Sequence, residues 1–371
     1  SVVGRLGGSG NLSSLDPSLR GREDNTPIEL NEIPVDATAH MTTGLEEMDR
    51  VLGGGFVAGS TTLLAGDPGI GKSTLLLQAA VAIAEAGRKV LYATGEEALG
   101  QIRIRASRLG AKGEGVFMVG TGDVLDIADH ITRIKPTVVI VDSVQTATHP
   151  DLDSPAGTVS QIRECAAFLS AVARAAHTAL VLSGHVTKDG AVAGPRVLEH
   201  MVDTVLYLEG DPISSLRILR GAKNRFGSTN EVGVFEMTTE GLVDVEDPSK
   251  AFLSERKGVT VGSVITSTME GSRPLLVEIQ ALTTPSALSQ PRRIATGVDF
   301  NRLILICAIL TRRAGMTLSN QDVVVNIPGG LRVAEPAADL GMALATASSI
   351  RDIPLGEGTA AIGEVGLNGE V

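Results

Sequence analysis

The sequence predicts an α/β fold with a parallel sheet in its N-terminal part and a smaller α+β domain after it. Short apolar runs alternate with helical patterns between residues 60 and 185, which is typical of a covered parallel sheet. A glycine-rich loop joins the first of these runs to a helix. From Gly258 onwards alternating strands and longer helices take over. We therefore expect a flexible leader at residues 1–36, a first domain at 37–250 and a second at 251–371.

Composition limits the possible functions. The chain has 371 residues, 43% of them hydrophobic, which is enough for two domain cores without disulfides. Cys165 and Cys307 lie far apart, so neither a disulfide framework nor a zinc site is expected. No apolar run approaches the ~18 residues of a membrane span, which favours a cytoplasmic protein. A net charge of −11 and the absence of tryptophan argue against a generally basic nucleic-acid coat and against base stacking on aromatic platforms.

The loop matches the phosphate-binding pattern G-x-x-x-x-G-K-[ST], between a buried strand at residues 60–65 and a helix at 75–86. Its glycines allow backbone N–H groups to turn inward around a phosphate, and the helix N-terminus adds a positive dipole end. Lys72 is expected to reach the β- and γ-phosphates, and Ser73 to hold Mg²⁺. The predicted ATP-binding residues are Gly66, Asp67, Pro68, Gly69, Ile70, Gly71, Lys72, Ser73 and Thr74.

Carboxylates follow two further strands. The run at residues 89–94 delivers Glu96 and Glu97, and a carboxylate there can orient or deprotonate a water that attacks the γ-phosphate. Glu96 is favoured because it comes first off the strand, but Glu97 stays open, as does the alternative of two solvated carboxylates that begin a helix. The aliphatic run at 138–141 ends in Asp142, which is placed to hold the water shell of Mg²⁺.

The strand at residues 178–183 leads to a histidine and a glycine-bearing loop. His185 is a candidate sensor of the γ-phosphate, although a structural role is an equal alternative. Lys188 and Arg196 flank the loop at 189–196, which would contact DNA phosphates by charge if the protein surrounds a strand; otherwise it is an ordinary surface loop.

Three alternating runs, at residues 203–209, 214–220 and 231–237, are expected to extend the sheet with antiparallel strands. A basic cluster containing Lys223 and Arg225 lies between the last two, in a predicted turn. Within one subunit it has no obvious phosphate. A neighbouring subunit's nucleotide would supply one, and the cluster would then stabilise the transition state; the alternative is a solvated hairpin tip.

Several motifs together resemble the RadA (Sms) family of bacterial DNA repair and recombination proteins, over nearly the whole chain from about residue 37. They are LGGG at 52–55, the phosphate loop, GEE at 95–97, GHVTKDG at 184–190, AGPRVLEHMVDTVLY at 193–207 and KNRFG at 223–227. The last is highly specific, whereas the phosphate loop alone is not. The resemblance implies a RecA-like P-loop ATPase core, a Lon-protease-like C-terminal domain and hexameric rings like the DnaB helicase. It also implies that Glu96 activates water and that Lys223 and Arg225 act across a subunit interface.

Two departures from the family pattern matter. RadA proteins usually begin with a four-cysteine zinc finger, and this chain starts at Ser1 without those cysteines, so no zinc is expected here. The chain is also expected to stop partway through the part that resembles the Lon fold. In Lon proteases a serine follows Gly-Pro and works with a lysine, but Ala337 stands at that place and no lysine follows Lys257. The second domain is therefore expected to lack peptidase activity. It would build the ring and a basic DNA surface from Arg292, Arg293, Arg302, Arg312 and Arg313.

The function implied is that of a DNA-dependent ATPase in recombination and repair. A homohexamer binding ATP or ADP with Mg²⁺, and working with a recombinase such as RecA, would translocate on single-stranded DNA and promote branch migration, with no membrane involved. Two alternatives are kept. One is a regulatory ATPase similar to KaiC, and the other is an ATP-dependent protease, against which Ala337 argues.

Overall fold

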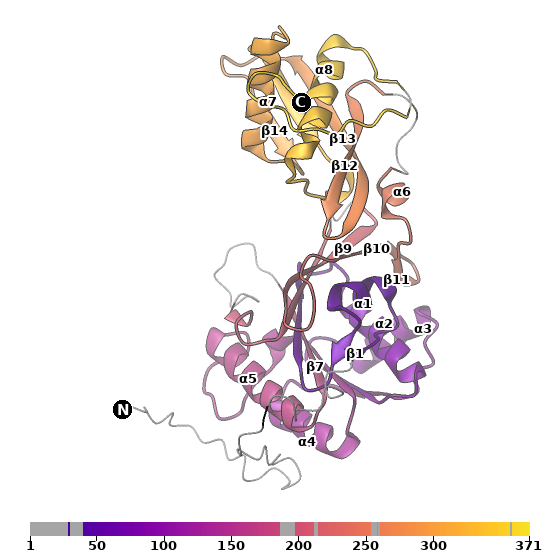
Figure 1. Cartoon of the computed structure of the whole chain (residues 1–371). Helices are drawn as coiled ribbons and strands as arrows, with labels where there is room; N and C mark the ends of the chain where they lie inside the picture. The colour runs from indigo at the N-terminus through magenta and orange to yellow at the C-terminus, as the bar shows by residue number, and fades with distance from the viewer. Residues whose placement is uncertain are drawn as a thin grey trace. The chain divides into compact units, whose positions relative to one another are not determined.

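The computed structural model describes residues 29, 40–185, 197–210, 214–253, 258, 260–356 and 358–371. The chain divides into two compact units (Figure 1). Unit 1 comprises the described residues up to Glu209 together with Arg217–Asp244. Unit 2 comprises the described part of Gly210–Leu216 and of Val245–Val371.

Unit 1 is organised around a large sheet, in which the described residues form nine strands in the order β11-β10-β9-β8-β3-β7-β6-β4-β5. Strands β8, β3, β7, β6, β4 and β5 run parallel, and β9 to β11 add an antiparallel extension beside β8. Their bounds are β3 Thr61–Gly66, β4 Val90–Thr94, β5 Val116–Val119, β6 Val138–Asp142, β7 Ala179–His185, β8 Thr204–Glu209, β9 Leu216–Asn224, β10 Val232–Thr238 and β11 Gly241–Asp244. A separate pair joins β1 (His40–Met41) to β2 (Phe56–Val57). This is the RecA-like P-loop arrangement that the sequence predicts.

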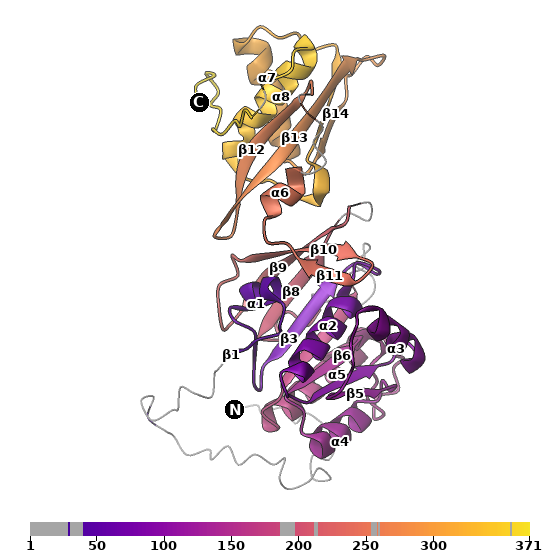
Figure 2. The same cartoon turned by 90° about the vertical axis from the view of Figure 1, so that its right-hand side faces the viewer.

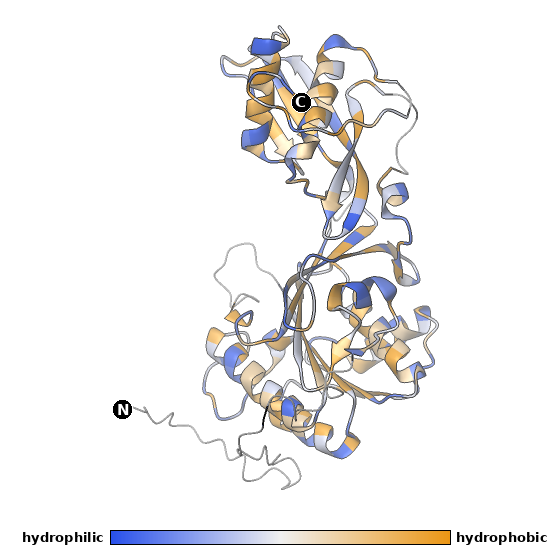
Figure 3. Cartoon of the chain, viewed as in Figure 1, coloured by the Kyte–Doolittle hydropathy of each residue, from blue (hydrophilic) through white to orange (hydrophobic). Residues whose placement is uncertain are grey.

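Helices cover both faces of the parallel strands (Figure 2). Helices α2 (Lys72–Glu85) and α3 (Leu99–Arg108) pack on one face, against residues such as Leu64 and Ile140. Helices α4 (Val124–Ile134) and α5 (Val159–Ala175) pack on the other, against Leu63 and Val139. Neighbouring strand residues thus point into different cores, which explains why the strands are continuously apolar rather than alternating. Figure 3 shows the central strands as hydrophobic along their length.

The antiparallel extension holds a short helix, α1 (Glu46–Leu52), at both ends. Asp244 of β11 accepts a hydrogen bond from Glu46 N at 2.9 Å, and Asn224 at the end of β9 donates from Nδ2 to Leu52 O at 3.1 Å. Gly53 then ends the helix with a left-handed φ of 78°, a conformation glycine adopts without strain. The LGGG and KNRFG motifs, far apart in sequence, are therefore in direct contact.

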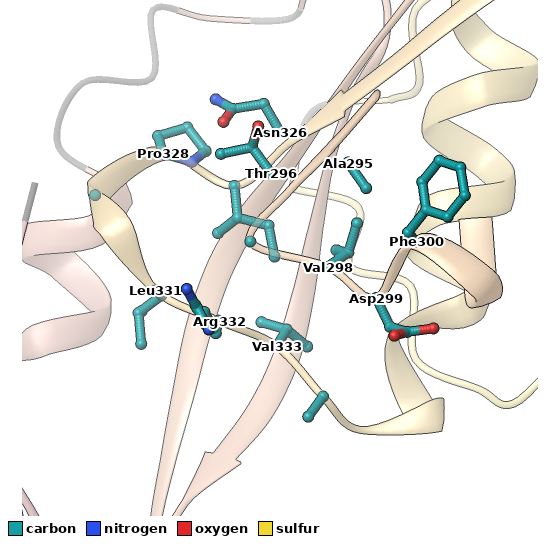
Figure 4. A pocket seen from close by; sticks show the side chains of 14 residues that line it. Ala295, Thr296, Val298, Asp299, Phe300, Asn326, Pro328, Leu331, Arg332 and Val333 are labelled. Carbon is teal, nitrogen blue, oxygen red and sulfur yellow. The ribbon is translucent and has the colours of Figure 1, made fainter. Parts of the chain in front are cut away.

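Unit 2 is an α+β structure with a four-stranded sheet, in the order β12-β13-β15-β14 over its described residues. Helix α8 packs against β12 and β13, and α7 packs against α8 and β14. The bounds are α6 Pro248–Leu253, β12 Ser263–Glu270, β13 Arg273–Pro285, β14 Arg293–Thr296, α7 Phe300–Arg313, β15 Gln321–Asn326 and α8 Asp339–Arg351, with 3-10 turns η7 at Pro328–Gly330 and η8 at Pro336–Ala338. Segments following β14 and β15 line a cavity of about 620 Å³ (Figure 4).

One prediction about this fold is wrong. The run at residues 214–220 was expected to end before a turn that carried the basic cluster, but β9 continues to Asn224 and includes Lys223. A register irregularity opposite Val205 and Leu206 lets the strand continue through Gly221. Among the helices in the described parts of the chain, none is long and apolar enough to cross a membrane.

Candidate nucleotide-binding site

The phosphate loop connects the carboxyl end of β3 to the N-terminus of α2. Gly69 and Gly71 have positive φ values of 77° and 119°, so the loop needs residues without a Cβ. A Cβ on Gly66 would lie 2.5 Å from the carbonyl oxygen of Leu208 in β8. Within the described residues no side chain caps the first turn of α2, and no acidic residue lies in it. Its N–H groups are thus available to an anion.

Lys72 is the first residue of α2 and is only 3% exposed. Its Nζ donates to the carbonyl oxygens of Gly66 and Asp67, each at 2.9 Å, and lies 3.0 Å from His185 Nδ1. Burial lowers the pKa of this ammonium, and the nearby carboxylates of Asp142, Glu96 and Asp67 partly offset that shift. The arrangement holds a positive charge at the mouth of the loop by contacts that a phosphate can replace.

His185 links Lys72 to Glu96. An ammonium only donates hydrogen bonds, so Nδ1 must accept from Lys72, and we assign the ring proton to Nε2. Nε2 then donates to Glu96 Oε1 at 3.0 Å, and Ser143 Oγ donates to the same carboxylate oxygen. The hydrogen bond from His185 lowers the pKa of Glu96 most, with help from Ser143 and against the effect of burial. Glu96 is therefore held as a carboxylate beside the loop.

Glu97 lies outside this network. Its Oε2 forms an ion pair with Arg105 Nη2 of α3 at 2.5 Å, and both side chains are about three-quarters buried. Of the two neighbouring glutamates, Glu96 is the one that contacts His185, the group next to Lys72.

Asp142, at the end of β6, is 6% exposed. Tyr92 of β4 donates its hydroxyl proton to Asp142 Oδ2 at 2.8 Å. The other oxygen, Oδ1, is buried without a hydrogen-bond partner among the described residues. A buried carboxylate oxygen with no partner fits the water shell of a cation.

These donors fit Mg²⁺ rather than a cation caged by the protein. No group of three potential metal-ligating side chains occurs among the described residues. Mg²⁺ usually takes only one or two protein groups and fills its coordination with water and substrate phosphates. Ser73 at the start of α2 and Asp142 would hold it, and the ion would neutralise phosphate charge.

The basic cluster lies at the other end of the sheet from the loop. Lys223 pairs with Val205 at the start of β8, whereas Leu208 near its end pairs with Gly66 of the loop. Lys223 Nζ donates to the carbonyl oxygens of Glu199 and Val202, at 2.8 and 2.6 Å. Arg225, with 60% of its side chain exposed, forms an ion pair with Asp203. The structure thus brings Lys72, Glu96, Asp142 and His185 together and places Lys223 and Arg225 elsewhere; Lys188 and Arg196 lie outside the described residues.

Sequence comparisons supply the family. The "AAA domain" family model matches residues 26–191, a range that includes the loop, Glu96, Asp142 and His185. DNA repair protein RadA of Listeria monocytogenes is 46% identical over 367 residues, which cover 97% of this chain and 80% of that protein. DNA repair protein RadA of Bacillus subtilis is 49% identical over 346 residues, covering 93% and 74%. The chain belongs to the RadA family. A solved KaiC-like protein, PH0186 of Pyrococcus horikoshii, aligns with 56% of this chain and 99% of its own at a TM-score of 0.47 and 21% identity.

In this RadA-family chain the sequence did not reveal every residue that shapes the site. Tyr92 and Ser143 carry no motif, and each reaches a carboxylate that comes from another strand or from the loop after one. The signal that could have found Tyr92 is its place in β4, the strand that lies beside β6 and pairs Thr94 with Asp142. That pairing cannot be read from the sequence without the strand order.

The second unit of this RadA-family chain contains Ala337, the residue expected from the sequence at the position of a Lon-type nucleophile. Ala337 lies in η8, and its carbonyl oxygen accepts from Gly363 N at 2.8 Å. Beside it, the guanidinium of Arg302 forms a two-bond ion pair with the buried carboxylate of Asp339. Arg293 Nη2 likewise donates to Leu318 O at 2.8 Å. Arg302 and Arg293 are partly buried, whereas Arg292, Arg312 and Arg313 are exposed.

Proposed function

We propose that this RadA-family chain is a DNA-dependent ATPase of recombination and repair that works as a homohexameric ring. The observation that carries the proposal is the separation of its two charged motifs. Lys72 and Glu96 lie at one end of the sheet, and the KNRFG motif lies at the other. A complete site then needs two subunits, as in a head-to-tail ring.

Hydrolysis would divide its roles among the residues of the first site. The loop N–H groups and Lys72 bind the phosphates of ATP, and Glu96 orients and deprotonates the attacking water. His185 touches both Lys72 and Glu96, so a phosphate that draws Lys72 away changes the hydrogen bond of the residue that contacts Glu96. His185 is thereby proposed as the sensor of nucleotide occupancy.

The neighbouring subunit would supply the remaining charge. Arg225 is mostly exposed, whereas the ammonium of Lys223 is bound to two carbonyl groups of its own chain. We therefore assign the direct contact with the neighbour's phosphates mainly to Arg225. Lys223 would contribute by holding the segment at residues 199–202 in place as well as by its charge.

The proposed substrate track is single-stranded DNA, with Lys188 and Arg196 contacting its phosphates by charge. ATP hydrolysis around the ring would drive translocation and branch migration, in company with a recombinase such as RecA. The RadA relatives are named as DNA repair proteins, which supports a role in repair; the DNA track, translocation and the recombinase belong to the proposal.

The test compares ATP hydrolysis with and without single-stranded DNA. We expect DNA to raise the rate several-fold and Lys72→Ala to abolish it. Arg225→Ala should bind ATP normally and lose about 10³-fold or more in kcat, the scale of an arginine finger. A rate indifferent to DNA would favour the regulatory, KaiC-like alternative.

Mixing variants tests the two-subunit site directly. Subunits with Lys72→Ala have no working loop but keep Arg225, and those with Arg225→Ala have the reverse. Mixed rings should regain hydrolysis at boundaries where an intact loop meets an intact arginine. Failure to regain any activity, in rings shown to be mixed, would reject the shared site.

A further inference from the structure

Asp203 is joined to both the phosphate-loop strand and Arg225. It lies directly before β8 and exchanges two hydrogen bonds with Thr61, the first residue of β3. Asp203 N donates to Thr61 O at 2.9 Å, and Thr61 N donates to Asp203 Oδ2 at 3.0 Å. On its other side, Arg225 N donates to Asp203 O at 3.2 Å, and Arg225 Nη1 lies 3.4 Å from Asp203 Oδ1.

The two halves of this contact differ in rigidity. Asp203 is 8% exposed and Thr61 is 1% exposed, so their paired hydrogen bonds lie in the body of the sheet. Arg225 follows the last residue of β9 and points largely into solvent. A long exposed side chain samples many rotamers, and ordering it at the moment of reaction costs entropy. A fixed carboxylate beside it removes part of that cost beforehand.

The contact leaves Arg225 able to bind something else. The ion pair joins Nη1 to the carboxylate at 3.4 Å, while a guanidinium carries five N–H donors in a planar fork. The remaining donors can meet the oxygens of a phosphate without the ion pair having to break.

We propose that Asp203 is a positioning residue that holds Arg225 ready for the nucleotide of the neighbouring subunit. The inference rests on the shared site proposed above. It goes further by assigning Asp203 an effect on another subunit. The carboxylate of Asp203 is hydrogen-bonded to β3, the strand before the phosphate loop of its own subunit, but it acts through Arg225 on the nucleotide site of the neighbouring subunit.

The variant Asp203→Asn separates the contact with Thr61 from the contact with Arg225. Asparagine keeps an oxygen that can accept from Thr61 N, so β3 and its loop stay intact, but it loses the charge that attracts Arg225. We expect unchanged ATP affinity and a roughly 10- to 100-fold lower kcat, the size of effect that a misplaced catalytic group produces. Asp203→Glu should recover part of the loss because the charge returns.

Asp244→Asn is the matched control. Asp244 also accepts hydrogen bonds from distant backbone N–H groups, those of Glu46 and Glu47, but the described residues place no arginine against it. Its kcat should stay within about twofold of the wild type, as for a substitution that leaves the catalytic groups in place.

Mixing variant subunits shows whether Asp203→Asn impairs the nucleotide site of its own subunit or that of the neighbouring subunit. Asp203→Asn subunits combined with Lys72→Ala subunits should regain hydrolysis, because the intact loop of the former meets the well-held Arg225 of the latter. A merely structural defect would damage the loop of the Asp203→Asn subunit and would regain nothing. In addition, Asp203→Asn should add little to Arg225→Ala in the double variant.

The outcomes separate this inference from the function beneath it. If Arg225→Ala hydrolyses ATP normally, or fails to complement Lys72→Ala, the shared site itself is wrong. If Arg225→Ala behaves as proposed but Asp203→Asn matches or exceeds wild-type kcat, or lowers kcat without complementing, only the positioning role is overturned.

Discussion

Tyr92 defines the orientation of the buried aspartate at the end of β6. Its hydroxyl occupies Asp142 Oδ2, which leaves Oδ1 as the oxygen without a partner in the described structure. Burial and the adjacent carboxylate raise the pKa of Tyr92 well above its ordinary value, so the phenol keeps the proton it donates. The pair thus fixes which carboxylate oxygen meets the water shell of Mg²⁺.

Tyr92→Phe should therefore raise the Mg²⁺ concentration needed for half-maximal ATP hydrolysis. The change removes one hydroxyl and leaves a buried carboxylate oxygen unsatisfied, a loss of about 1–3 kcal/mol shared between stability and metal binding. Titration of hydrolysis with Mg²⁺ at saturating ATP measures it. Tyr207→Phe is the control, since that hydroxyl donates to Glu199 at 2.6 Å instead. Equal Mg²⁺ dependence in both variants would contradict the role.

Ser143 offers a test of how Glu96 is kept charged. The pKa of Glu96 is lowered, so its carboxylate stays ionised below the pH at which an ordinary glutamate takes up a proton, and it is lost only as pH falls through the lowered value. Ser143→Ala removes one of the groups that lower the pKa. The acid limb of kcat/KM for ATP should move to higher pH, with the rate at neutral pH little changed.

Ser183→Ala provides the comparison for that pH profile. Ser183 is also fully buried near a strand end, but its hydroxyl has no hydrogen-bond partner within the described residues. The acid limb of kcat/KM for ATP in Ser183→Ala should coincide with that of the wild type. A shift in Ser183→Ala as large as in Ser143→Ala would point to a general packing effect.

For single residues, the sequence predicted the charged groups of the site better than the residues that orient them. Lys72, Ser73 and Asp142 follow from a motif and from strand ends, and the order off the strand favoured Glu96, which the structure places beside His185. Tyr92 and Asp203 could not be predicted in the same way. Each acts through a neighbour fixed by strand order or register, which depends on the whole sheet.

Among elements, the connection from β3 to α2 depends on two glycines for different reasons. Gly69 has a left-handed φ but open space around its Cα, whereas Gly66 has no positive φ but faces the backbone of β8. One position is limited by conformation and the other by close approach.

Alanine at these two positions should separate the two causes. Gly69→Ala should cost about 1 kcal/mol, the strain of a left-handed residue. Gly66→Ala must push β3 away from the carbonyl oxygen of Leu208 and should cost roughly 3 kcal/mol. Urea unfolding of the two variants measures the difference. A larger loss in Gly69→Ala would mean that strand contact does not limit the loop.

Element boundaries depended on tertiary contacts in the same way. The helix at residues 124–134 was predictable because its apolar stripe is its own signal. Strand β14 could not be predicted because its four residues show no clear alternation, and it exists through parallel pairing with β15. The extra length of β9 likewise comes from β8 beside it.

For the whole molecule, the second unit is organised around a buried ion pair of its own. Asp339 at the start of α8 is 1% exposed and is bound by Arg302 of α7, while Val365 N donates to it at 3.2 Å. Both helices and the segment after them therefore meet at one carboxylate. The ion pair, Val365 and their packing partners all belong to unit 2. Loss of the ion pair should therefore destabilise unit 2 without changing unit 1.

Arg302→Met should destabilise the unit by about 3 kcal/mol or more, because it leaves a buried carboxylate without its cation. The affinity for ATP, which depends on unit 1, should be unchanged. Thermal unfolding followed alongside ATP binding measures both, and Arg312→Met on the exposed side of the same helix is the control. If ATP affinity fell in step with stability in Arg302→Met but not in Arg312→Met, the two units would have to fold as one, and the nucleotide site would depend on a carboxylate outside its own sheet.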